Sequence, residues 1–189
     1  MSLAALWYSF YGLWVGSEVW IGIATRTRHS TGNVRDRGTM RLLWIVLFTT
    51  ITAGIWISET MESNLPGGAP WLEVAALLVL IGGLALRWSA IASLGKSFSS
   101  NVAIHATQKV LKTGLYRWMR HPSYTGLMLC IFAVALHTRN WISMLVIVPP
   151  CFAAVSYRIY VEEIALREHF GEEYVAYSRE TKRLVPGLY

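Results

Sequence analysis

The sequence predicts an all-α integral membrane protein with five transmembrane helices. Of the 189 residues, 54% are hydrophobic and 15% are charged, and the mean hydropathy is +0.40. Such a composition leaves too few polar side chains to cover a soluble domain of this size. Helices are the expected element because a sheet edge in lipid would leave backbone groups unpaired. A helix crosses the hydrocarbon with roughly 20 mostly apolar residues, which is the scale of the apolar runs along this chain.

The predicted spans are separated by loops of contrasting charge. They cover residues 3–24, 42–58, 71–94, 122–136 and a fifth run that begins at Trp141. The loop after the first span is basic, with Arg26, Arg28, Arg35, Arg37 and Arg41. The connector after the second span has no Lys or Arg. Because basic loops stay in the cytoplasm, we expect the N-terminus outside, the C-terminus inside, and residues 95–121 on the cytoplasmic face.

We expect a single membrane domain over residues 1–189. Residues 1–94 form a three-helix scaffold in this prediction, and residues 95–189 form the cofactor-binding and catalytic half. Pro149 and Pro150 interrupt the fifth span and are expected to bend it. Beyond them the chain is charged but keeps apolar residues at helical spacing, as in a helix that leaves the membrane. Cys130 and Cys151 lie in apolar runs, which is typical of reduced core cysteines.

Two charged residues fall inside predicted spans. Glu18 lies near the end of the first span and is expected to extend to the interface, with a transport role as the alternative. Arg87 lies late in the third span, so it either reaches the lipid headgroups or faces a polar cavity. Small residues that permit close helix packing are Gly12, Gly16, Gly82 and Gly83.

The net charge of +6 does not by itself indicate a nucleic acid partner. Lys and Arg cluster beside hydrophobic segments, as expected for a face that meets anionic lipid headgroups. We therefore expect membrane lipids as the surroundings, no nucleic acid partner, and no obligate protein partner.

The stretch GLYRWMRHPSYTG, which begins at Gly114, combines a turn with aromatic and basic residues directly before the fourth span. Pro122 suits the first position of a helix, because its missing N–H would be unpaired there. His121 then lies in the cap region, where backbone donors and the helix dipole favour an anionic group. Arg120 adds a positive charge. The alternative is a basic membrane anchor followed by a helix start.

A second group of charges, Arg158, Glu162 and Glu163, follows the prolines of the fifth span. Arg158 and Glu162 are four residues apart, so they share a helix face and can pair, whereas Glu163 points elsewhere. The group is either an interfacial ion pair or part of a site for a charged cofactor or substrate. Since the fourth and fifth spans form a hairpin, we expect His121 and Glu162 to face one pocket.

The segments LKTGLYRWMRHPSYTG, RIYVEE and FGEEYVAY follow one another in order. In these motifs the chain resembles the isoprenylcysteine carboxyl methyltransferase family and its phospholipid methyltransferase relatives, as a short, prokaryotic-type member. The resemblance covers the last half of the chain. It implies S-adenosylmethionine in a membrane-embedded pocket that opens to the cytoplasm, with S-adenosylhomocysteine as the product. The chain correspondingly lacks a βαβ unit opened by a G-x-G-x-x-G turn.

The resemblance also implies roles for individual residues. The cofactor site would comprise Asn101, Gln108, Lys109, Val110, Leu111, Tyr116, His121, Pro122, Ser123, Tyr124 and Glu162. Arg158 would face the acceptor group, and Arg158, Glu162 and Glu163 would form the catalytic group. No metal is expected, because displacement at a reactive sulfonium needs mainly alignment and exclusion of water.

The expected function is methyl transfer to a lipid-like acceptor, first of all the carboxylate of a prenylated cysteine or an analogue. A carboxylate is ionised near neutral pH and needs no general base, and Arg158 would position it by bidentate hydrogen bonds. A phospholipid amine or a small thiol is the alternative acceptor, and each would need a route for proton loss. Two other classes stay open: an NADPH-dependent membrane reductase, which the short chain disfavours, and a non-enzymatic assembly or transport protein.

Overall fold

The computed structural model describes residues 2–25, 33–34, 38–62, 65, 70–95, 98, 103–104, 109–187 and 189. Its helices are α1 (Leu3–Ala24), α2 (Thr39–Thr60), α3 (Pro70–Leu94), α4 (Pro122–His137), α5 (Trp141–Phe170) and α6 (Glu172–Glu180), with the 3-10 helix η2 (Gly114–Arg117). The two-residue strands β1 (Asn33–Val34) and β2 (Ala103–Ile104) pair antiparallel, which the sequence did not predict. The prediction of an all-helical fold is otherwise confirmed.

Of the helices that the structure describes, α2, α3 and α5 are long and apolar enough to cross a membrane. The helix α4 is apolar but shorter, and α1 is not among the three. The helix α1 contains several Trp, Tyr, Ser and Gly residues among its aliphatic ones, and these lower its mean hydropathy. The crossings by α1 and α4, and with them the five-span topology and its orientation, stay predictions.

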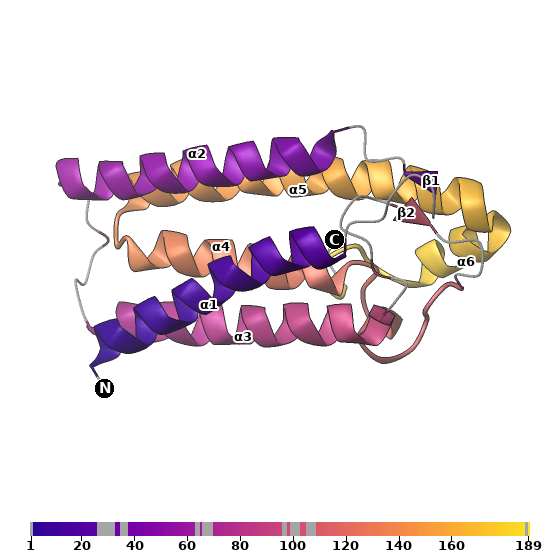
Figure 1. Ribbon diagram of the computed structural model, residues 1–189, viewed down its shortest axis with the longest axis horizontal. Coiled ribbons are helices and arrows are strands. Elements are labelled where there is room, and N and C mark those ends of the chain that lie inside the picture. Colours follow the sequence, from indigo (N-terminus) through magenta and orange to yellow (C-terminus); the bar gives the residue numbers. More distant parts are fainter. Residues whose placement is uncertain are drawn as a thin grey trace.

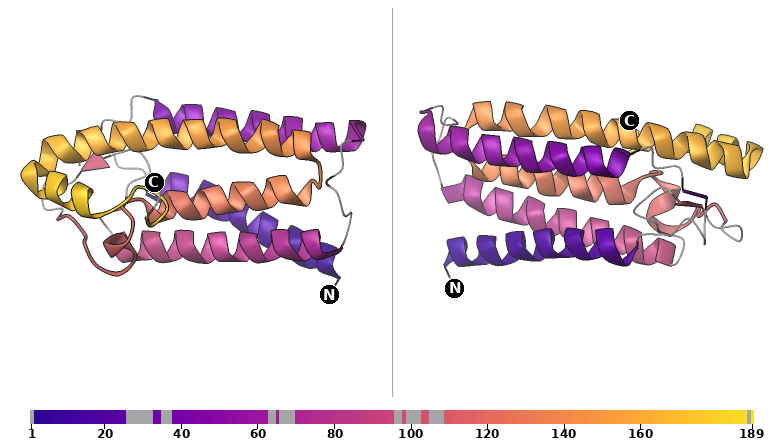
Figure 2. Two further views of the ribbon diagram at one scale, coloured as in Figure 1. Left: turned by 180° about the vertical axis from the view of Figure 1, so that it is seen from behind. Right: turned by 45° about the horizontal axis from the view of Figure 1, so that its top comes forward.

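The long helices lie roughly along one direction (Figure 1). The helices α2 and α5 lie side by side, α3 packs along α4, and α1 contacts α3 at an oblique angle (Figures 1 and 2). The elements η2, β1, β2 and α6 gather at the end where α5 extends beyond the other helices. Both stretches that the sequence analysis marked as functional, the start of α4 and the second half of α5, therefore lie at the same end.

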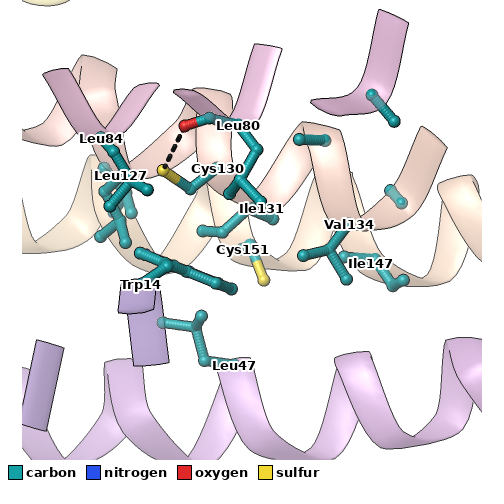
Figure 3. Close-up of a cluster of buried hydrophobic side chains, with 14 of the residues drawn as sticks. Trp14, Leu47, Leu80, Leu84, Leu127, Cys130, Ile131, Val134, Ile147 and Cys151 are labelled. Atoms are coloured by element: carbon teal, nitrogen blue, oxygen red, sulfur yellow. Dashed lines mark hydrogen bonds between the residues drawn. The ribbon is translucent and has the colours of Figure 1, made fainter. Parts of the chain in front are cut away.

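The core lies between α3, α4 and α5, and α1 and α2 add side chains to it (Figure 3). Leu80, Cys130 and Cys151 are almost fully buried. The thiol of Cys130 lies 3.9 Å from the Leu80 carbonyl oxygen, and Cys151 lies 3.3 Å from the Thr50 hydroxyl. Both cysteines are free. Their prediction as small core residues is therefore confirmed.

Two glycines let the backbones of α3 and α4 touch. A Cβ atom on Gly126 would lie 2.6 Å from the Arg87 nitrogen and 2.7 Å from the Gly83 oxygen. No side chain fits there without moving α3. Gly83 thus serves the close packing that the sequence predicted. A Cβ at Gly12, Gly16 or Gly82 would meet no described atom within 4 Å, so these three do not pack closely within the described chain.

The helix α5, which forms the second half of the hairpin, is continuous through its two prolines. Asn140 caps α5, with its side-chain oxygen accepting from the Ser143 N–H at 3.0 Å. Pro149 and Pro150 lie inside α5, which runs on to Phe170. The two prolines therefore do not end the helix, and α5 carries residues from the apolar core to the charged end in one element.

Candidate active site

The turn before α4 has the local structure that its residues predict. His121 is the N-cap residue and Pro122 is the first residue of α4. Gly114 begins η2 with a φ of 60°, a left-handed conformation that favours glycine. The turn directs Tyr116 inward, where its hydroxyl donates to the Ala90 carbonyl of α3 at 3.2 Å. Burial and the nearby Glu162 carboxylate raise the pKa of Tyr116, so its phenol stays a donor at neutral pH.

The hydroxyl of Tyr124 connects Arg158 with Glu162. It accepts from Arg158 Nε at 2.7 Å and donates to Glu162 Oε2 at 2.9 Å. A second nitrogen of Arg158 donates to the Thr39 hydroxyl of α2 at 2.8 Å, and Arg158 is only 1% exposed. The spacing allowed a direct pair of Arg158 and Glu162, but among the described contacts the two are linked through a tyrosine of α4. Tyr124, Arg158 and Glu162 form what we call the central triad.

Glu163 faces a different cluster, as its place on the helix predicts. Its carboxylate lies 2.9 Å from Arg120 Nε, 3.0 Å from Arg183 Nη2 and 3.4 Å from His121 Nε2. Arg167, one turn further along α5, lies 3.5 Å away. Glu163 is 2% exposed, so this cluster compensates the cost of burying its charge. The carboxylate holds the turn before α4 against the end of α5.

The segment after α6, residues 181–187, packs against this turn. The N–H groups of Arg120 and His121 donate to the carbonyls of Lys182 and Arg183 at 2.8 and 2.9 Å. Arg120 also donates through Nη1 to the carbonyls of Ser178 and Thr181. Its guanidinium is therefore committed to the C-terminal segment and to Glu163, and does not point a free charge at a ligand.

The helix α6 adds a further contact that our sequence reasoning missed. Tyr177 donates to the Tyr116 carbonyl at 2.6 Å. Burial raises the pKa of Tyr177 to about 12, so it also stays protonated at neutral pH. Tyr177 is the last residue of the FGEEYVAY motif. The motif indicated that the C-terminal end belongs to the site, but its spacing did not predict which residue Tyr177 contacts.

A cavity of about 320 Å³ lies beside the central triad. Its apolar wall comes mainly from α1 and α2, with residues such as Trp14, Leu43, Leu47, Phe48 and Ile51. Tyr124 and Arg158 line it together with Glu18 and Arg87. The cavity thus combines a long apolar wall with a small group of polar side chains, the usual composition of a site for an amphipathic ligand.

Glu18 and Arg87 form a buried ion pair between α1 and α3. Arg87 donates through Nε and Nη2 to the two carboxylate oxygens of Glu18, the second bond measuring 2.6 Å. Arg87 Nη1 donates to the Ser123 carbonyl at 2.9 Å. Glu18 is 8% and Arg87 6% exposed. The expectation that Glu18 extends to the interface is wrong, because its partner lies inside the bundle. Arg87 is buried and lines the cavity, so it follows its second alternative in facing a cavity, although the wall of this cavity is mainly apolar.

The remaining predicted residues are only partly placed. Lys109 is exposed, and Val110 and Leu111 are half-buried in the segment before η2. Pro122 and Ser123 are buried in the first turn of α4. Asn101 and Gln108 lie outside the described residues, as do Arg26, Arg28, Arg35 and Arg37 of the basic loop. Within the described ranges, no three His, Cys, Asp or Glu side chains are grouped so as to hold a metal ion.

The described helices, three of them apolar and of membrane-spanning length, define an all-α integral membrane protein, and its amphipathic cavity lies beside a buried polar cluster at one end. Residues 75–168 match the model of the isoprenylcysteine carboxyl methyltransferase (ICMT) family. The chain belongs to this family.

Individual relatives agree with that assignment. The chain is 32% identical over 123 residues to protein-S-isoprenylcysteine O-methyltransferase B of Arabidopsis thaliana, covering 61% of this chain and 60% of that one. It is 32% identical over 146 residues to the Rattus norvegicus protein-S-isoprenylcysteine O-methyltransferase, covering 75% and 50%. It also resembles the solved structure of the eukaryotic intramembrane Ras methyltransferase ICMT, with a TM-score of 0.60 and 25% identity, covering 75% and 52%. The chain thus spans about half to three fifths of the length of these relatives.

Proposed function

We propose that this protein is an S-adenosylmethionine-dependent methyltransferase that acts on a lipid-like carboxylate, that of a prenylated cysteine or an analogue. The observation that carries the proposal is the link from Arg158 through the Tyr124 hydroxyl to Glu162. It connects a cation that lines the amphipathic cavity with a carboxylate beside the start of α4. An anionic acceptor and a cationic methyl donor are the two ligands that this pair of charges suits. The names of the relatives support the same reaction.

The acceptor side of the proposed site is the cavity. Its α1 and α2 wall offers apolar surface to a prenyl chain, and the favourable free energy of burial scales with the apolar area that leaves water. Arg158 lies at the polar part of this cavity, where a guanidinium suits the planar geometry of a carboxylate. A carboxylate attacks as the ionised oxygen, so no side chain has to remove a proton.

The cofactor side of the proposed site is the turn before α4 with Glu162. The donor set fits S-adenosylmethionine. Glu162 supplies a negative charge for its ammonium or sulfonium group, and the N-terminal end of α4 favours its carboxylate. Tyr116 and Tyr124 supply aromatic faces, which attract cations. When bound, the cofactor supplies the electrophilic methyl group. From the family resemblance we also propose Asn101, Gln108, Lys109, Val110, Leu111, His121, Pro122 and Ser123 as cofactor contacts.

Within the proposed catalytic group, we assign Glu163 an indirect part. Its carboxylate is surrounded by Arg120, Arg183 and His121 and does not line the cavity. It therefore acts on the reaction by fixing His121 and the turn that carries it. Arg158 and Glu162 are the residues proposed to contact acceptor and cofactor. We also propose that the whole chain, residues 1–189, is one domain, since the first two helices contribute the wall of the cavity.

Radiolabelled methyl transfer tests the function. Purified protein in lipid nanodiscs is given S-adenosylmethionine labelled in its methyl group and one of three acceptors: N-acetyl-S-farnesylcysteine, a phosphatidylethanolamine, or an alkyl thiol. We expect label in the farnesylcysteine ester. Label in the amine or the thiol would select the alternative acceptors. Folded protein that binds no S-adenosylmethionine in calorimetry, or that is stabilised by NADPH alone, would contradict the proposed class.

We further propose a multi-pass topology with the central triad opening towards the cytoplasm. The C-terminal end of α2 and the helix α6 lie at opposite ends of the bundle (Figure 1). Met61 follows α2 and Arg179 belongs to α6; both are exposed, and each is replaced singly by cysteine. A membrane-impermeant maleimide should label Met61→Cys in intact cells and Arg179→Cys only in inverted vesicles. Labelling of Arg179→Cys in intact cells would reverse the orientation. The native cysteines are buried and provide the unlabelled background.

A further inference from the structure

The ion pair between Glu18 and Arg87 lies in the wall of the same cavity as Arg158. Glu18 belongs to α1, outside residues 75–168 that match the family model. Its two carboxylate oxygens take two nitrogens of the Arg87 guanidinium, and the third nitrogen donates to the Ser123 carbonyl. Ser123 directly precedes Tyr124, and the hydroxyl of Tyr124 accepts from Arg158. Two guanidinium groups thus line one small cavity.

We propose that Glu18 is a specificity-determining residue that limits the negative charge of the acceptor head group. This inference rests on the proposed function. Glu18 holds Arg87 against α1 and Ser123 and neutralises it, so that Arg87 does not act as a second anion-binding group beside Arg158. The cavity then selects a head group with the single charge of a carboxylate over one with the higher charge of a phosphate monoester, which carries about −1.5 to −2 near pH 7.

The physical reason is the cost of an unpaired charge in a wall of low polarity. A guanidinium that is buried without a counter-ion is strongly unfavourable, and it recruits any anion that reaches it. Charges a few ångströms apart also interact more strongly inside a protein than in water. Removing the charge of Glu18 therefore adds one positive charge to the cavity wall. Removing the charge of Arg87 adds one negative charge instead.

A purely structural pair that fastens α1 to α3 would behave differently. Changing either residue of such a pair would lower the stability of the fold. It would not change the relative affinity for ligands of different charge. The two single variants separate the two roles because the proposal requires opposite shifts in charge preference. The double variant Glu18→Gln with Arg87→Gln removes one charge of each sign and restores the charge of the wall.

The experiment compares two ligands that share a farnesyl chain. One is S-farnesylthioacetic acid, whose head group is a carboxylate, and the other is farnesyl phosphate. Their inhibition constants are measured against N-acetyl-S-farnesylcysteine on wild-type protein, Glu18→Gln, Arg87→Gln and the double variant. We expect Glu18→Gln to shift the ratio of the two constants about tenfold towards the phosphate. Arg87→Gln should shift it towards the carboxylate, and the double variant should return close to the wild-type ratio.

The affinity for S-adenosylmethionine is measured on every variant, to show that each is folded and to separate two kinds of failure. A wild-type protein that binds no S-adenosylmethionine and transfers no methyl group defeats the proposed function. If the wild type is active and the ratio is the same in Glu18→Gln, the present inference is overturned. Should Glu18→Gln not fold, Arg87→Gln decides alone, because an unchanged ratio in that variant overturns it equally.

Discussion

Glu163 of α5 and Arg183 of the C-terminal segment form an ion pair, with Arg183 Nη2 at 3.0 Å and Nε at 3.2 Å from the same carboxylate oxygen. The other oxygen of Glu163 takes Arg120 at 2.9 Å. One buried carboxylate thus joins the turn before α4, the end of α5 and the segment after α6. The proposed cofactor site depends on this junction, because His121 lies next to Arg120 and its N–H is held by the Arg183 carbonyl.

Replacing Glu163 by Gln should loosen the junction. The variant leaves Arg120 buried without its counter-ion, and we expect a loss of about 3 kcal/mol in the free energy of unfolding. We also expect about tenfold weaker binding of S-adenosylmethionine in calorimetry, equivalent to ~1.4 kcal/mol. The control is Glu180→Gln, which makes the same change on an exposed position of α6. If Glu163→Gln abolishes turnover while cofactor affinity and stability are unchanged, Glu163 takes part in the chemistry directly.

Tyr124 offers a sharper test, because Phe keeps its volume and removes only the hydroxyl. Arg158 and Glu162 then each lose a partner at 2.7 and 2.9 Å. Stripping a hydrogen bond from a buried charged group costs about 1.5–3 kcal/mol. We expect Tyr124→Phe to lower kcat/KM by roughly tenfold or more in the methyl-transfer assay.

The matched control for that variant is Tyr157→Phe, an exposed tyrosine directly before Arg158 on α5. It should retain wild-type rates. Equal activity of Tyr124→Phe and Tyr157→Phe would show that the tyrosine link is dispensable for methyl transfer. The proposed function would then lose its main structural support.

The sequence predicted the features that depend on neighbouring residues. Pro122 and His121 are placed by the rules for a helix start, and Glu163 diverges from Glu162 because adjacent residues of a helix face different sides. The hairpin of α4 and α5 then brought the start of one helix to the charged half of the other. These inferences needed only local geometry and one short connection.

The contacts that sequence reasoning missed join distant segments. Glu18 and Arg87 lie 69 residues apart, and Tyr124 and Arg158 lie 34 apart. Such pairs depend on which helix faces which, and spacing within one helix carries no information on that. Glu18 was expected at the interface because a lone carboxylate near a helix end commonly extends there. Its arginine partner comes from a helix whose packing on α1 the sequence did not reveal.

Gly126 supplies a prediction on packing. Gly126→Ala would place a Cβ atom 2.6 Å from the Arg87 nitrogen and force α3 away from α4. Overpacking of this kind costs about 1–3 kcal/mol. It should also disturb the bond from Arg87 to the Ser123 carbonyl, and so weaken binding at the polar part of the cavity. Thermal unfolding in detergent measures the first effect.

Gly82→Ala is the matched control, since a Cβ at Gly82 meets no described atom within 4 Å. We expect it to be neutral or slightly stabilising, because alanine favours a helix over glycine. The packing argument fails if both alanine variants unfold at the same temperature as the wild type.

Arg158→Lys separates the acceptor from the cofactor. Lysine keeps the positive charge, but it lacks the planar fork with which Arg158 donates to the Tyr124 hydroxyl and to Thr39 at the same time. The lost fork should raise the KM for N-acetyl-S-farnesylcysteine about tenfold, ~1.4 kcal/mol, and leave the Kd for S-adenosylmethionine within about twofold of the wild type. Arg139→Lys is the control, because Arg139 is exposed at the far end of the bundle and pairs with Glu73. An Arg158→Lys variant that loses affinity for both ligands equally would place the arginine between the two sites, and one that loses only the cofactor would reverse the assignment of Arg158 and Glu162.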